Sequence, residues 1–189
     1  PRWMLLCFAV LGEVVLALAL KDVRLLGFVH AMVIIAVGFY GLLRRDLEVV
    51  ILTIAYTTGS EVLWRQTSAP VFYLTAPYLV IALSLLSVIL VLRHLGRDAR
   101  LAALYGLLLI PAAAATVRTA GSGSREIIAF ALSGPIALAT FVMVTSQVTM
   151  KRPLYRRMLW VILVSSVGPL TVAVSDMRSD LANAAITFS

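Results

Sequence analysis

The chain has 189 residues, of which 61% are hydrophobic and only 13% are charged, about half the ~25% charged content of ordinary globular proteins. This composition excludes a soluble domain, which would expose large apolar patches to water, and predicts a polytopic α-helical membrane protein. The net charge of +7 does not indicate nucleic-acid binding, because the basic residues form short clusters between apolar runs, where they usually orient helices. The single cysteine, Cys7, excludes an internal disulfide.

Seven apolar runs predict an all-α bundle of seven transmembrane helices. In chain order they cover Trp3–Leu20, Leu25–Leu43, Leu47–Arg65, Val71–Leu92, Leu101–Val117, Arg125–Met150 and Met158–Ser175. Several of these runs reach the ~17–25 residues that a helix needs to cross a hydrocarbon core. The segments between them are short and polar, and a polar tail, residues 176–189, follows the last helix.

The ends of the chain indicate a single transmembrane helical domain, residues 1–189, that belongs to a longer protein. The chain begins with Pro1 instead of methionine and ends inside a polar stretch, "NAAITFS". Ala17-Leu18-Ala19 resembles the cleavage site of a signal peptide. We favour a retained first helix, because Glu13 interrupts its apolar core and only Arg2 supplies a leading positive charge.

Lysine and arginine counts predict how the helices are oriented. The N-terminus and the loops after the second, fourth and sixth helices carry ten basic residues: Arg2, Arg44, Arg45, Arg93, Arg97, Arg100, Lys151, Arg152, Arg156 and Arg157. The opposite side carries six: Lys21, Arg24, Arg65, Arg118, Arg125 and Arg178. Because the richer side is normally cytoplasmic, we expect the N-terminus inside and the tail after the seventh helix outside.

Charged and aromatic residues end the third predicted helix. Glu61 and Arg65 are four residues apart, so they share a helix face and can pair, and Trp64 suits the lipid–water boundary. Two interpretations stay open for this group. It is either an interfacial anchor with a self-satisfied ion pair, or a charge pair at the outer mouth of the bundle that contacts an anionic ligand.

Residues 118–135 combine arginines with a helix start. Ser124 is a reasonable N-cap, and a helix N-terminus offers unpaired N–H groups that suit phosphate. Arg118 and Arg125 flank this start, which favours either a diphosphate site on the outer face or an ordinary capped turn. On the same side, Arg178 lies in a polar tail that is either a solvated turn or the start of an outer loop.

Prolines inside the apolar runs predict bent helices. Ser133-Gly134-Pro135 should interrupt the sixth helix and Gly168-Pro169 should bend the seventh, because proline removes a backbone hydrogen bond. Pro111 and the four alanines after it suggest a kinked and closely packed fifth helix. His30 shares its helix face with no second histidine, which favours a hydrogen-bonded histidine inside the bundle.

Three stretches of the chain look like motifs of a known family: "GSEVLWRQTSAPVFY", residues 59–73; "REIIAFALSGPIALA", residues 125–139; and "SDLANAAITFS", residues 179–189. They resemble the N-terminal half of the O-antigen ligase and polymerase-like family, which are bacterial inner-membrane glycosyltransferases of the GT-C-like type. The helix pattern resembles that family over most of the chain, whereas motifs for nucleotide motors, zinc proteases and haem sites are absent from the sequence.

The resemblance implies glycan transfer on the outer face of the bacterial inner (plasma) membrane. A glycan carried on undecaprenyl diphosphate would move to a glycan, lipid or protein acceptor, without a metal or nucleotide cofactor and without nucleic acid. Arginines would hold the diphosphate and stabilise the departing charge. The candidate contacts, chosen by charge, are Arg65, Arg118, Arg125 and Arg178 with Glu61. The family's acid/base histidine lies in a later outer loop, so no catalytic residue is assigned here.

Two other functions compete with this reading. A membrane transporter or lipid flippase would use the proline-containing helices as gates, since broken helices form many midplane binding sites. The objection to a transporter is that no acidic residue other than Glu13 lies convincingly in mid-membrane. The third possibility is a non-catalytic subunit whose seven helices act as a scaffold for partners.

Overall fold

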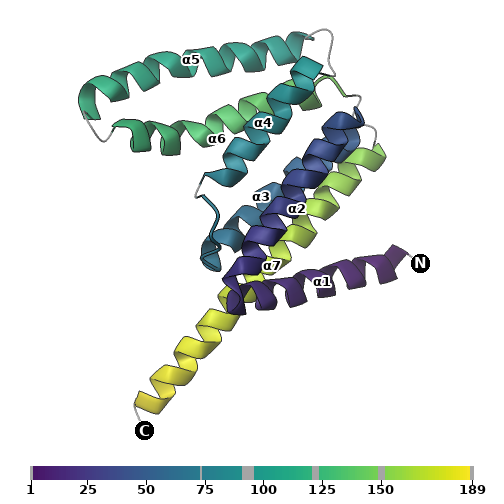
Figure 1. Ribbon diagram of the computed structural model, residues 1–189, viewed down its shortest axis with the longest axis vertical. Coiled ribbons are helices and arrows are strands. Elements are labelled where there is room, and N and C mark those ends of the chain that lie inside the picture. The colour runs from purple at the N-terminus through teal and green to yellow at the C-terminus, as the bar shows by residue number, and fades with distance from the viewer. Residues whose placement is uncertain (1, 73, 91–95, 121–123, 149–151, 188–189) are drawn as a thin grey trace.

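The computed structural model describes residues 2–72, 74–90, 96–120, 124–148 and 152–187 (Figure 1). The side chains at positions 2, 120, 124–126, 130 and 179–187 lie outside this description. The described residues form seven helices: α1 (Arg2–Asp22), α2 (Arg24–Leu43), α3 (Leu47–Gln66), α4 (Thr75–Leu90), α5 (Arg97–Ala120), α6 (Ser124–Thr145) and α7 (Arg152–Thr187). The predicted all-α class is confirmed for this part of the chain, which contains no strand.

The helices have the length and composition of membrane spans. Six of the seven described helices are long and apolar enough to cross a membrane, and α4 is equally apolar but has only 16 residues. Large apolar side chains on the outer helices are mostly uncovered by protein, as Phe8 on α1 and Leu108 on α5 show with 64% and 65% exposure. Such surfaces need lipid as their solvent, so the chain is a multi-pass membrane protein.

Helix α3 lies at the centre of the molecule and packs against α2, α4 and α7. It is rich in small and hydroxyl side chains, which allow close approach of neighbouring helices in a membrane. The hydroxyls bond within the helix: Thr57 Oγ1 donates to the Thr53 carbonyl at 2.8 Å and Ser60 Oγ to the Tyr56 carbonyl at 3.0 Å. These polar groups are therefore buried without loss of hydrogen bonds.

Figure 1 shows α2, α3, α4 and α7 running alongside one another, with α1 and the α5–α6 hairpin extending to opposite sides. The hairpin is attached through the contact between α4 and α6, and α1 is attached mainly through α7. Two ion pairs join neighbouring helices: Arg157 of α7 with Glu48 of α3, and Lys21 of α1 with Asp176 of α7 at 2.6 Å. Each pair links residues that the sequence places on one side of the membrane.

Several predicted boundaries were wrong. Helix α4 begins at Thr75 instead of residue 71, and the connection from α3 passes through Ser68, which adopts a left-handed φ of 49°. Helix α7 begins at Arg152 instead of Met158. Pro153 lies in its first turn, where backbone N–H groups make no hydrogen bond within the helix, so proline is tolerated there. The tail after residue 175, predicted to be either a solvated turn or the start of an outer loop, continues as helix to Thr187.

The fifth and sixth helices also differ from expectation. Helix α5 starts four residues earlier than predicted and includes Arg118, and the alanines after Pro111 are largely exposed instead of closely packed. Helix α6 runs through Ser133-Gly134-Pro135 without interruption. Residues 121–123, which precede α6, and the side chain of the predicted N-cap Ser124 lie outside the described part of the structure.

Candidate functional site

Glu61 and Arg65 form an ion pair at the end of α3, as their spacing predicted. Both side chains are partly exposed, 25% for Glu61 and 39% for Arg65, so water or a ligand can reach them. Trp64 differs from its prediction as an anchor at the lipid boundary. It is 5% exposed, and its Nε1 donates a hydrogen bond of 3.1 Å to Nδ1 of His30 on α2.

Two cavities share the Glu61–Arg65 pair as part of their lining. The smaller one, of about 240 Å³, lies between the end of α3 and the start of α4 and is also lined by Trp64 and Phe72. The larger one, of about 510 Å³, has walls from α3, α4, α6 and α7. Its volume falls within the roughly 300–1,000 Å³ that is usual for small-molecule sites.

The larger cavity, called here the α3–α6 cavity, is apolar apart from its charged end. Thr58, Glu61 and Arg65 line it from α3, and Ser133 and Gly134 line it from α6. The remaining lining is mainly alanine, leucine, isoleucine and valine, with Phe141 as its one aromatic side chain. Residues of two stretches that are far apart in the sequence, 59–73 and 125–139, therefore meet around one cavity.

The other predicted diphosphate contacts lie elsewhere. Arg118 is exposed in the last turn of α5, and Arg178 is exposed near the C-terminal end of α7. Figure 1 shows these two helix ends well apart, and neither arginine lines a described cavity together with Arg65. Arg125 is in the first turn of α6, but its side chain lies outside the described residues.

A buried chain of four polar side chains joins α1, α2 and α3. Glu13 of α1 accepts a hydrogen bond of 2.5 Å from the Tyr56 hydroxyl, which lies 3.1 Å from Nε2 of His30. His30 in turn accepts the bond from Trp64. The prediction that His30 is satisfied inside the bundle is confirmed, and its ring meets Tyr56 and Trp64 edge to face, with centroid distances of 5.7 and 5.9 Å.

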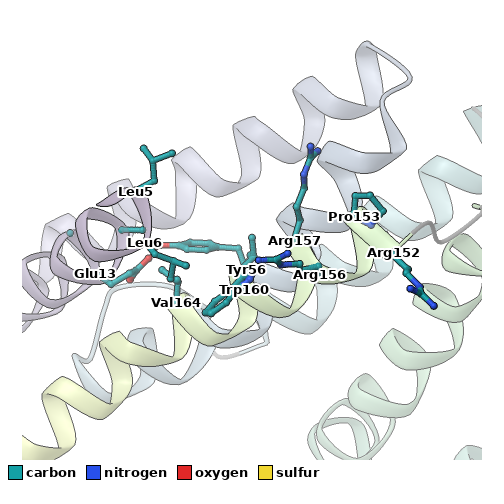
Figure 2. Close-up of a pocket in the computed structure, with 13 residues that line it drawn as sticks. Leu5, Leu6, Glu13, Tyr56, Arg152, Pro153, Arg156, Arg157, Trp160 and Val164 are labelled. Atoms are coloured by element: carbon teal, nitrogen blue, oxygen red, sulfur yellow. Dashed lines mark hydrogen bonds between the residues drawn. The ribbon is translucent and has the colours of Figure 1, made fainter. Parts of the chain in front are cut away.

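A groove of about 1040 Å³ runs along α1 and α7 and ends at this chain (Figure 2). Glu13 and Tyr56 line one end, and the arginines of the first turns of α7 line the other. Between them the walls are apolar, with Leu6 of α1 and Val164 of α7 among the lining residues. Because Trp64 also lines the 240 Å³ cavity, the buried chain connects this groove with the Glu61–Arg65 region.

The sequence contained only part of the signal for this arrangement. Glu13 inside an apolar run was visible, because charges at membrane depth are costly and often mark function. Tyr56 was missed, since a tyrosine in a membrane helix has no local pattern that predicts a partner 43 residues away. In the part of the chain that the structure describes, no three histidine, cysteine, aspartate or glutamate side chains gather as a metal site would require.

No protein-family model, curated protein or solved structure matches this chain. Its function is therefore inferred from its own residues and their geometry.

Proposed function

We propose that this chain belongs to a membrane glycosyltransferase of the O-antigen ligase and polymerase type, with a GT-C-like fold. In this proposal it moves a glycan from undecaprenyl diphosphate to an acceptor on the outer face of a bacterial inner membrane, and its N-terminus is cytoplasmic. The observation that carries the proposal is the α3–α6 cavity. Stretches from α3 and α6 that resemble this family converge on one apolar space with a cation at its end.

The chemistry of this cavity suits a polyprenyl diphosphate. Its apolar walls match isoprenoid carbons, which take the place of equally apolar lipid tails, so the walls accommodate the chain and the charged end supplies the selectivity. At its charged end, Arg65 carries a planar guanidinium that matches phosphate oxygens. Glu61 holds this guanidinium in place before a ligand arrives. A cation at the diphosphate would also stabilise the charge that develops as the glycan departs.

A binding experiment with the full chain in lipid nanodiscs tests the proposal. We expect undecaprenyl diphosphate to bind more tightly than undecaprenol, which has the same chain and no charge. Arg65→Gln should weaken diphosphate binding by ~10–100-fold, because a hydrogen bond to a charged group contributes ~1.5–3 kcal/mol and 1.4 kcal/mol is a factor of ten. It should leave undecaprenol binding unchanged.

Two control variants separate the site from general charge effects. Glu61→Gln removes the competing carboxylate and keeps the cation, so diphosphate binding should be kept or strengthened. Arg97→Gln removes an exposed arginine from the first turn of α5, away from the cavity lining, and should bind like the wild type. Equal affinity for diphosphate and alcohol in the wild type, or an Arg65→Gln variant with undiminished binding, would overturn the proposal.

A transporter or lipid flippase is the second candidate, and one observation favours it. Glu13 is 7% exposed and lies in a cross-helix hydrogen-bond chain, as ionisable residues of proton-coupled carriers do. Transport predicts that the wild type moves a labelled polyprenyl phosphate across vesicle membranes without an acceptor. A transferase predicts no such movement, so a flipping assay in protein-containing vesicles distinguishes the two functions.

A further inference from the structure

Glu13 lies deep within the membrane-spanning part of the protein. Helix α1 has 21 residues, which corresponds to about 30 Å of helix, so it matches the thickness of a hydrocarbon core. Glu13 is near its middle, and the flanking residues of α1 are almost all apolar. The carboxyl group is therefore far from either aqueous surface along the helix axis.

The two carboxyl oxygens of Glu13 have different environments. Oε1 accepts the hydrogen bond from Tyr56, whereas Oε2 is buried and has no hydrogen-bond partner. Oε2 faces Gly168 of α7, where an added Cβ would lie 3.6 Å from it. Packing against glycine thus covers this oxygen without offering a donor. An ionised carboxylate in this position would hold an unpaired buried charge, and such groups normally neutralise instead.

The direction of the hydrogen-bond chain follows from Trp64. The indole N–H is only a donor, so Nδ1 of His30 must be the acceptor and carry no proton. Neutral His30 then has its proton on Nε2 and donates it to the Tyr56 oxygen. Tyr56 must in turn donate its own hydrogen to Oε1 of Glu13. A proton bound to Glu13 can therefore lie only on Oε2.

We propose that Glu13 is a proton-binding site within the membrane, which holds a proton on Oε2 at neutral pH and exchanges it with water in the groove between α1 and α7. The exchange converts the carboxylic acid and a water molecule into carboxylate and hydronium, with no other bond changed. Glu13 lines this groove, and because Oε2 itself is covered, exchange requires a local movement that brings this oxygen into contact with the groove water. The proposal stands on the Glu13 environment alone and does not depend on glycan transfer.

The groups that face Glu13 from neighbouring helices do not supply a counter-charge. Tyr56 of α3 and His30 of α2 are neutral members of the hydrogen-bond chain, and the covering residue of α7 is Gly168. On α1 itself, Lys21 is two turns away and pairs with Asp176. Among the described residues, Glu13 forms no ion pair with any cation.

The cations of the groove lie toward its other end. Figure 2 shows Arg152 and Arg157 directed away from Glu13, and Arg157 pairs with Glu48 of α3. Arg156 extends toward Tyr56, whose ring lies between it and Glu13 in this view. These arginines would attract anions to the entrance of the groove, but none of them neutralises the buried carboxyl group.

Infrared spectroscopy of the full chain in nanodiscs tests this inference directly, because a protonated carboxyl group has a C=O stretching band that a carboxylate lacks. At neutral pH the wild-type spectrum should contain this band, and Glu13→Gln should remove it. The band should persist well above pH ~4.3, where a solvated glutamate loses its proton. Glu48→Gln, which changes an exposed and ion-paired carboxylate, should leave the band unchanged.

A second variant tests the direction of the chain and does not rely on the folding of Glu13→Gln. Tyr56→Phe removes the donor to Oε1, which is the carbonyl oxygen of the protonated acid. The band should remain and move to higher frequency, because its carbonyl no longer accepts a hydrogen bond. Two results would show that Glu13 is not protonated as proposed. One is a wild-type spectrum at neutral pH without the acid band, and the other is an acid band that neither Glu13→Gln nor Tyr56→Phe alters.

Discussion

Alanine in place of Gly59 should loosen the contact between α3 and α7, on which the central position of α3 depends. A Cβ at this position would lie 2.0 Å from Oγ of Ser165 and 3.0 Å from its carbonyl carbon. Normal carbon contacts lie at ~3.5–4.0 Å. Rotation of the serine side chain relieves only the first clash, so the α7 backbone would have to withdraw by roughly half an ångström or more. Overpacking of this kind costs ~1–3 kcal/mol.

The loss can be measured by unfolding the protein in mixed micelles with increasing SDS, followed by far-UV circular dichroism. Gly106→Ala on α5 is the matched control, because a Cβ there meets nothing within 4 Å. It should leave stability unchanged or raise it by up to ~1 kcal/mol, since alanine is the better helix former. If Gly59→Ala and Gly106→Ala unfold alike, the close contact between α3 and α7 is refuted.

Two further predictions concern the proposed diphosphate site and the hydrogen-bond chain. Arg125→Ala should reduce glycan transfer while leaving expression in the membrane intact. Arg125→Lys keeps the positive charge and should retain part of the activity. Unchanged transfer in the alanine variant would remove Arg125 from the proposed diphosphate site. Trp64→Phe should lower the free energy of unfolding by ~1–3 kcal/mol, because the half-buried His30 loses its donor. Trp3→Phe, at a side chain that is 76% exposed, is its control in the same SDS titration, and equal effects would argue against the bond.

The sequence predicted the helices well because hydropathy is a local property. A run of apolar residues of sufficient length identifies a span wherever its neighbours lie, and the i,i+4 spacing identified the Glu61–Arg65 pair for the same reason. Boundaries were less well predicted where charges lie inside a helix. Arg156 and Arg178 looked like loop residues, yet both belong to α7, whose 36 residues extend about 54 Å and exceed the hydrocarbon thickness.

The packing of the helices could not be predicted in the same way. Lipid tails are as apolar as leucine, so hydropathy carries no signal for which face of a membrane helix meets protein. Trp64 illustrates the consequence. An indole side chain by itself favours the lipid–water boundary. His30, which is 34 residues away in the chain, accepts a hydrogen bond from the indole N–H and holds the ring in the core. Only the relative rotation of α2 and α3 determines that outcome.

Helix α3 has the lowest mean hydropathy of the six candidate spans and the largest buried share, and these two properties explain each other. Polar side chains are expensive against lipid, so a helix that carries them is stable only when other helices surround it. One face of α3 directs Tyr56 and Trp64 toward Glu13 and His30, and another presents Glu61 and Arg65 to the α3–α6 cavity. The least lipid-like span thus contributes residues to both proposed sites, the one for an anionic lipid and the one for a proton.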